Sequence, residues 1–286
     1  LPNLKGLWCS NGALTTLDTS GIPNVESLLC NDNHLTALNV SNMPHLETLY
    51  CQDNQITVLD VAADVGLKVL ACENNLIATL DVTNLILLTD ITCDNNNISA
   101  LNISALTNLY GLSCDNNPVG SLDLSNSTLI SRLSVSNCNL GALSVSHLHN
   151  LRTLDCSKNH LTALQLPTVT YFHIGSHGSV ARMRFNCSNN LFETLDFSPI
   201  NVNLCTLYLG DNPNLTYVNI KNNRTRYEVM SLNDCPNLNY ICINAYPENV
   251  SQPYGGIFQY INDQSVLDNI QINPYCSFTP GGVYNT

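Results

Sequence analysis

The stretch VESLLCNDNHLTALNVS, residues Val25 to Ser41, contains the pattern that decides the fold of this chain. Its form is LxxLxCxxNxLxxLxVS, with Val25 at the first Leu position, and it returns every 21 residues. Cysteines mark the period, because they recur at this spacing at Cys9, Cys30, Cys51, Cys72, Cys93 and Cys114. A fixed period of this length predicts a repeat architecture in which each unit contacts mainly its neighbours.

The period continues toward the C-terminus with a few departures. After Cys114 the same position is held by Val135, Cys156, Cys187, Leu209 and Leu232. An insertion at 168–185 accounts for the longer step between Cys156 and Cys187. We therefore predict about eleven coils over residues 1–243, followed by a C-terminal cap or linker segment at 244–286.

Each coil is expected to contain one short strand. Apolar residues alternate around the cysteine position, as at Leu28 and Cys30, which is typical of a strand with one buried face. A second apolar trio, such as Leu35, Leu38 and Val40, closes the opposite wall. The pattern predicts a leucine-rich-repeat solenoid with a parallel β-sheet on the concave face. Short extended or 3₁₀ segments should form the convex side, because a 21-residue unit leaves no room for a long helix.

Asparagine and cysteine columns are interpreted as structural. The Asn three residues after each ladder position, as at Asn33, can satisfy backbone groups of its own turn and of the next coil. Cysteines in register on adjacent strands project in parallel and cannot easily adopt a disulfide dihedral of about 90°, so buried free thiols are expected. Outside the ladder, Cys242 and Cys276 are candidates for a disulfide, whereas Cys205 has no evident role. No CxxC pair supports a zinc site.

Composition narrows the classes of function. The chain has a net charge of -12, from 10 Lys and Arg against 22 Asp and Glu, which opposes binding to nucleic acid or to an anionic membrane. No GxSxG, phosphate-loop or HExxH motif occurs, so we expect neither an enzyme nor a cofactor. The first residues lack the features of a signal peptide, and the chain is interpreted as part of a longer processed protein.

The repeat resembles the cysteine-ladder leucine-rich repeats of bacterial surface proteins, the internalin J-like group, and those of secreted Bacteroidetes proteins. The resemblance covers residues 1–243 and rests on the period, on the cysteine column and on tails such as TLDVT at 79–83 and SLDLS at 121–125. The segments beginning at Leu238 and Pro274 are similar to those that follow such repeats in flavobacterial proteins. This resemblance implies one part of a larger cell-surface or secreted polypeptide. The insertion and the lack of a recognisable N-terminal cap depart from the family pattern.

The exposed strand positions supply the candidate binding residues. Trp8, Leu29 and Tyr50 directly precede the ladder in three successive coils and should form an aromatic and apolar cluster. For Trp8 the alternative is an end of the array that a preceding repeat would cover.

Charged residues follow along the predicted sheet. Glu73, Asp90, Asp94 and Asp115 predict a negative patch, which could bind a cation or a basic partner or could simply be solvated surface. Arg132 then changes the sign of the face, as would suit the orientation of a protein partner.

The insertion is a second candidate for recognition, because inserted loops on repeat arrays often carry it. It contains Tyr171, Phe172, His173 and His177. A metal site at the two histidines is disfavoured, since the intervening Ile-Gly-Ser argues against a helix.

We therefore predict a non-catalytic, extracellular protein-recognition or adhesion module that is monomeric and binds through its concave face. The alternatives are a passive spacer within a larger surface protein and a carbohydrate-binding module. Trp8, Tyr50 and the polar column Asp32, Asp53, Asn74 and Asn95 would suit a surface glycan.

Overall fold

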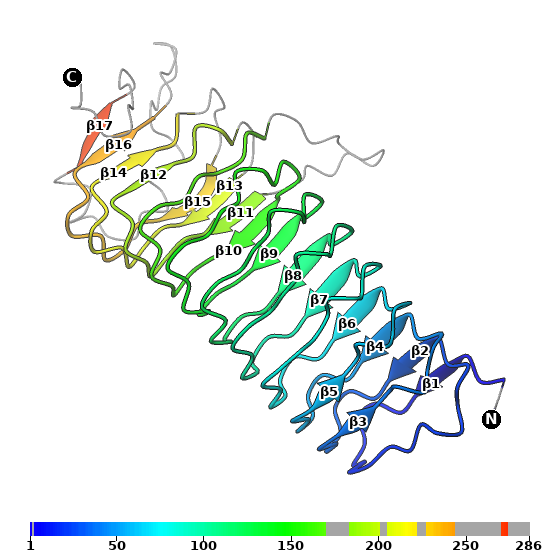
Figure 1. The fold of residues 1–286 in the computed structure, drawn as a ribbon. Helices are drawn as coiled ribbons and strands as arrows, with labels where there is room; N and C mark the ends of the chain where they lie inside the picture. The colour runs from blue at the N-terminus through cyan, green and yellow to red at the C-terminus, as the bar shows by residue number, and fades with distance from the viewer. Residues whose placement is uncertain (2, 170–182, 201–204, 222–226, 244–269, 274–286) are drawn as a thin grey trace. The chain divides into compact units, whose positions relative to one another are not determined.

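The computed structural model describes residues 1, 3–169, 183–200, 205–221, 227–243 and 270–273. The chain divides into two compact units, Leu1–Leu140 and Gly141–Thr286. Both consist of stacked coils with short parallel strands, and the described residues contain no helix (Figure 1). No helix in this part of the chain could therefore cross a membrane.

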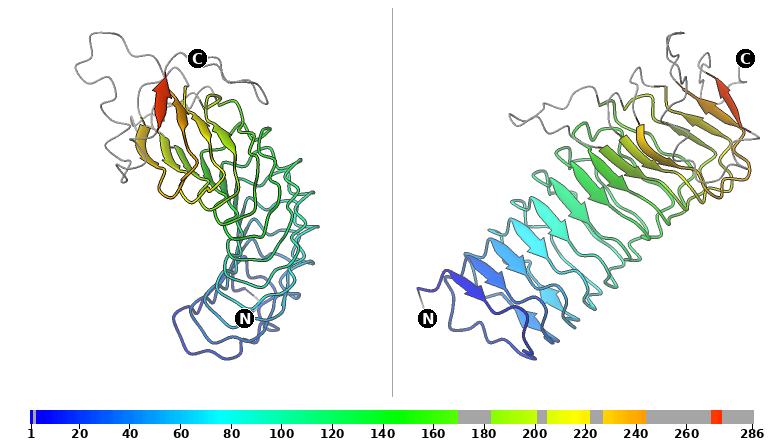
Figure 2. Two further views of the ribbon diagram at one scale, coloured as in Figure 1. Left: turned by 90° about the vertical axis from the view of Figure 1, so that its left-hand side faces the viewer. Right: turned by 180° about the vertical axis from the view of Figure 1, so that it is seen from behind.

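The first unit carries one row of parallel strands, with one strand in each coil (Figures 1 and 2). These strands are β1 (Gly6–Trp8), β2 (Ser27–Leu29), β4 (Thr48–Tyr50), β6 (Val69–Ala71), β7 (Asp90–Thr92), β8 (Gly111–Ser113) and β9 (Arg132–Ser134). Each strand ends directly before its ladder residue, which confirms the predicted strand positions. A second wall of the unit carries the short pair β3 (Leu38–Asn39) and β5 (Leu59–Asp60).

The second unit contains strands on two walls. The first wall is formed by β10 (Thr153–Asp155), β11 (Met183–Asn186), β13 (Cys205–Tyr208) and β15 (Tyr227–Ser231). The second wall is formed by β12 (Thr194–Asp196), β14 (Tyr217–Asn219), β16 (Tyr240–Cys242) and β17 (Gln271–Asn273). Across the insertion, β10 and β11 pair in register, with Thr153 opposite Arg184. The sequence predicted the first wall, but it did not predict a four-stranded sheet on the second.

The cysteines of the ladder form a column of thiols without disulfides. The cysteines from Cys30 to Cys114 are at most 1% exposed and are free, as predicted. Burial raises the pKa of Cys30 to about 12, so this thiol stays protonated and packs as a small apolar side chain. Cys205, which had no predicted role, is a buried thiol on β13 that forms no disulfide.

The asparagine column joins each coil to the one before it. The Asn33 side chain donates to the carbonyl oxygens of Cys30, at 3.0 Å, and of Cys9 in the preceding coil, at 2.9 Å. Its Oδ1 accepts from the amide of Leu14 at 3.1 Å. The structural role is confirmed, but the predicted contact with the next coil is wrong. Each ladder carbonyl can accept two hydrogen bonds, and Cys30 O also accepts from Asn54 of the following coil.

The LDVS-type tails form turns on the second wall. Asp81 Oδ1 accepts from the backbone amide of Thr83 at 3.0 Å and from its hydroxyl at 2.7 Å, and Asn39 binds Ser41 in the same way. These hydrogen bonds lower the pKa of Asp81. Aspartate and asparagine are interchangeable here, because the turn requires only a side-chain oxygen.

Candidate binding surface

An aromatic and apolar cluster lies at one end of the first unit, on the exposed side of its sheet. Trp8 pairs with Leu29 across β1 and β2, and Leu29 pairs with Tyr50 across β2 and β4. Paired positions in adjacent strands are about 4.8 Å apart, so the three side chains form one row. Trp8 is 75% exposed, and Leu29 and Tyr50 are partly exposed. We refer to Trp8, Leu29 and Tyr50 as the aromatic cluster.

The backbone around Trp8 leaves space for its indole ring. A Cβ placed on Gly6 would lie 3.4 Å from Cζ2 of Trp8, so the ring lies over the bare backbone at the start of its own strand. In the next coil after Tyr50 the row continues with Ala71, which is small and buried. The following members, Thr92 and Ser113, are polar. The cluster therefore has a defined boundary at β6.

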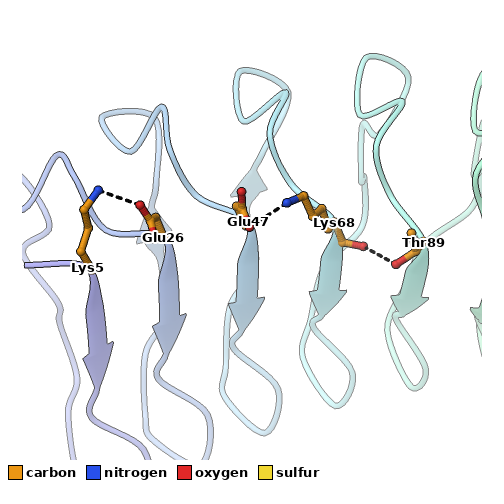
Figure 3. A network of polar contacts seen from close by, with 5 residues as sticks. All are labelled: Lys5, Glu26, Glu47, Lys68 and Thr89. Atoms are coloured by element: carbon orange, nitrogen blue, oxygen red, sulfur yellow. Dashed lines mark hydrogen bonds and ion pairs between the residues drawn. The ribbon is translucent and has the colours of Figure 1, made fainter.

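Ion pairs form a row at the amino ends of these strands (Figure 3). Lys5 contacts Glu26 at 2.6 Å, and Lys68 contacts Glu47 at 2.8 Å. Thr89 extends the row by donating to the carbonyl oxygen of Lys68. The hydrogen bond and the charge of Lys5 lower the pKa of Glu26. Exposed pairs of this kind contribute little to stability, but here they neutralise one border of the aromatic cluster.

The opposite border, at the carboxyl ends of the strands, has an unusual backbone. The second residue after each ladder position has a positive φ between 53° and 58° in all eleven described coils. Asn and Asp tolerate this left-handed conformation better than other non-glycine residues, which explains the column that was considered for glycan binding. The members are Asn11, Asp32, Asp53, Asn74, Asn95, Asn116, Asn137, Lys158, Asn189, Asp211 and Asp234.

The side chains of this column form an exposed amide ladder in the first unit. Asn74 donates to Asp53 at 2.8 Å, Asn95 donates to Asn74 at 2.7 Å, and the chain continues to Asn116 and Asn137. The ladder follows the coil stacking, since donor and acceptor are always 21 residues apart. The need for a positive φ could have been found in the sequence, because the described coils of the first unit have only Asn or Asp at this position.

The predicted acidic residues stand in two columns of the sheet. Asp90 accepts from Arg132 Nη2 at 2.5 Å across the intervening strand β8. The contact passes over Gly111, where a Cβ would lie 2.5 Å from Asp90 Oδ1. Arg132 also lies over the ring of Tyr110, with its Cζ 4.9 Å from the ring centroid. We refer to this arrangement of Asp90, Tyr110, Gly111 and Arg132 as the charged crossing.

Glu73, Asp94 and Asp115 belong to a different column, directly after the ladder. Asp94 accepts from the Ser113 hydroxyl at 2.7 Å and from the Asp115 amide at 2.7 Å. Asp115 accepts in the same way from the next coil, from Ser134 and from the backbone of Ser136. Burial raises the pKa of Glu73 and of Asp94. The described residues hold no group of three or more potential metal ligands.

Comparisons with known proteins agree with this geometry. The functional domain of InlJ from Listeria monocytogenes, which includes a cysteine ladder, aligns with 25% identity and a TM-score of 0.59. The alignment covers 94% of this chain and 63% of that chain, so the present chain spans less than two thirds of its length. YopM, a leucine-rich effector protein from Yersinia pestis, aligns over 95% of this chain and 84% of its own, with 21% identity and a TM-score of 0.54.

The repeated coil and the cysteine column identify the fold of this chain. The chain has the leucine-rich-repeat fold and contains a cysteine ladder. An internalin, InlF from Listeria monocytogenes, shows the same fold at 15% identity and a TM-score of 0.52, over 94% of this chain and 86% of its own. No protein-family model matches the sequence, and neither does any curated protein.

Two sets of predicted residues in this leucine-rich-repeat protein lie wholly or partly outside the described residues. The loop candidates Tyr171, Phe172, His173 and His177 fall there entirely. Cys242 is disulfide-bonded, but its predicted partner, Cys276, lies beyond the described part of the chain. The Cys242–Cys276 pairing therefore stays a prediction.

Proposed function

We propose that the chain is a non-catalytic, extracellular protein-recognition module that binds its partner at the aromatic cluster. The observation that carries this proposal is the alignment of Trp8, Leu29 and Tyr50 on three adjacent strands with their side chains accessible. Trp and Tyr are the residue types most enriched at interface hot spots. The polar rows on both borders match the rim that surrounds the apolar centre of a protein interface.

The rest of the strand face supports recognition rather than catalysis. Asp94 and Asp115 accept hydrogen bonds from neighbouring coils, and Asp90 pairs with Arg132. We propose that Arg132 and these acids orient a partner but contribute little to its affinity, since their polar groups already have partners. Solenoid proteins commonly use such extended faces for binding.

We further propose a cell-surface or secreted location and a monomeric state. The resemblance to bacterial surface proteins motivates the location, and the disulfide at Cys242 suits an oxidising compartment. A surface glycan is the second candidate ligand. Its support is that the first unit exposes both the indole of Trp8 and the amide ladder, because sugars require both a flat apolar surface and hydrogen-bonding groups.

Binding assays with matched variants test the proposed function. Trp8→Ala/Tyr50→Ala should lower affinity for a purified partner at least about tenfold, as expected for two hot-spot residues. Leu76→Ala/Leu129→Ala is the control, because these residues are 51% and 46% exposed at other places on the unit. A partner first captured from extracts is purified and measured by titration, and a glycan array is screened in parallel. Equal affinities for the cluster variant and the control would contradict the proposal.

A further inference from the structure

The first unit contains no spare positive charge. Residues 1–140 include three Lys or Arg side chains and thirteen Asp or Glu side chains. All three cations are used in ion pairs within the unit: Lys5 with Glu26, Lys68 with Glu47, and Arg132 with Asp90. Any charge that this unit presents to a partner is therefore negative.

The negative charge is placed beside the aromatic cluster. The backbone of the positive-φ column favours Asn or Asp, without preference between an amide and a carboxylate. In the first unit this column is charged only at Asp32 and Asp53 and holds Asn in the other five coils. Those two positions are three residues after Leu29 and Tyr50, the two members of the cluster on β2 and β4. The fold does not explain this coincidence, because Asn would serve it equally well.

Asp32 and Asp53 are available to a ligand. Both are exposed, and neither forms an ion pair with a Lys or Arg of the described chain. Asp32 accepts from Asn31, and Asp53 accepts from Asn74, contacts that leave the negative charges uncompensated. The amino border of the cluster is neutralised by its ion pairs, so the field across the cluster is negative at the carboxyl ends of the strands only.

We infer that the partner is a protein segment that carries Lys or Arg beside an apolar anchor residue. The apolar residue packs on Trp8, Leu29 and Tyr50, and the basic side chains contact Asp32 and Asp53. The aromatic rings add cation–π attraction to a cation held between them and the carboxylates. The inference rests on the proposed function, since it names the chemistry of the partner at the same cluster.

A selection of peptides tests the inference with the intact chain. A phage-displayed library of random peptides is selected on the wild-type protein, and the enriched peptides are synthesised. The relevant peptides are those that no longer bind Trp8→Ala/Tyr50→Ala. These should carry a net positive charge, with Lys or Arg adjacent to an apolar residue. Relevant peptides that are mainly neutral or acidic would overturn the inference and leave the proposed function intact. If no peptide depends on the cluster, both fail.

A matched pair of charge variants then locates the contact. Asp32→Asn/Asp53→Asn keeps the backbone, because Asn occupies the same column with the same φ in neighbouring coils. Its affinity for these peptides should fall about three- to tenfold at about 50 mM salt, and the difference should shrink at about 300 mM. Asp81→Asn/Asp123→Asn removes the same charge from the second wall, where Asn39 and Asn102 occur naturally. Equal losses in the two variants would indicate attraction by net charge alone and would overturn the assigned contact.

Discussion

The aromatic cluster and the charged crossing lie on the same sheet of the first unit and have nearly the same backbone. At the cluster, Trp8 is exposed and Tyr50 is partly exposed. At the crossing, Arg132 is held by Asp90 and by the ring of Tyr110, so its charge is used within the protein. Charged residues are the obvious candidates for binding in a sequence, but here most of those on the sheet form ion pairs or hydrogen bonds within the protein. The proposed binding site lies where the fold leaves apolar surface and two carboxylates without a counter-charge.

The largest expected effect concerns a polar group that no coil satisfies. Asp64 is 1% exposed, and its Oδ2 has no hydrogen-bond partner among the described residues. The equivalent positions in adjacent coils hold buried Met43 and Leu85. Burial, with a smaller contribution from the charge of Asp60, raises the pKa of Asp64 to about 7. A buried polar group without a hydrogen-bond partner in a neighbouring coil should lower the free energy of unfolding. Asp64→Leu should therefore stabilise the protein.

The stabilisation by Asp64→Leu should depend on pH. In the unfolded chain Asp64 ionises near pH 4, whereas in the folded protein it stays protonated until about pH 7. Its ionisation therefore lowers stability as pH rises through this window, and the loss is complete above the folded pKa. At pH of about 8, Asp64→Leu should gain roughly 3 kcal/mol, and the gain should shrink at pH of about 5. Urea unfolding at both pH values measures the difference, and a gain that is independent of pH would contradict the account.

The charged crossing should depend on the missing side chain at Gly111. A double-mutant cycle with Asp90→Ala and Arg132→Ala should give a coupling of about 0.5–1 kcal/mol, as is usual for an exposed pair. In a Gly111→Val background the coupling should approach zero, because the new side chain occupies the path between the two groups. Ser113→Val, in the same strand, is the control background. Unchanged coupling with Val at position 111 would show that the pair does not pass over this residue.

The smallest expected effect sharpens the contrast between the two regions. Arg132→Ala should change the affinity for a partner of the aromatic cluster by less than about threefold, because the guanidinium already has a carboxylate and an aromatic ring as partners. The same titrations that compare the cluster variants give this value. A loss as large as that of Trp8→Ala/Tyr50→Ala would place the charged crossing within the binding surface.

Much of the fold could be predicted because a period assigns residues to columns. The strand positions, the buried thiols and the structural role of Asn33 all follow from the column in which each residue stands. A period does not reveal whether a side chain contacts the preceding or the following coil, because both are offset by the same number of residues. The predicted contact of Asn33 with the next coil was therefore wrong. The Asp90–Arg132 contact was also hidden, because it joins coils two periods apart and depends on the absence of a side chain at Gly111.

The candidate surface was predictable only in outline. Trp8, Leu29 and Tyr50 could be placed in one row from their spacing, but whether neighbouring coils cover them depends on three-dimensional packing. The positive φ at Asp32 and Asp53 explains why Asn or Asp occurs there. It does not explain why these two positions hold a charged residue, and this choice indicates a role in binding only once the backbone conformation is known. The predicted acidic patch of Glu73, Asp90, Asp94 and Asp115 spans two columns, because Asp90 stands in a different column from the other three and pairs with Arg132.

Strand pairing across the insertion shows that the pairing of neighbouring strands does not depend on the number of residues in the coil between them. Residues Asp155 and Asn186 are 31 positions apart in sequence, yet their strands pair as directly as those whose residues are 21 apart. Additional residues in one coil therefore leave the β10–β11 pairing unchanged. A chain built in this way can acquire new loops by insertion while its existing contact surface is inherited without alteration, so that the two can evolve under separate selection.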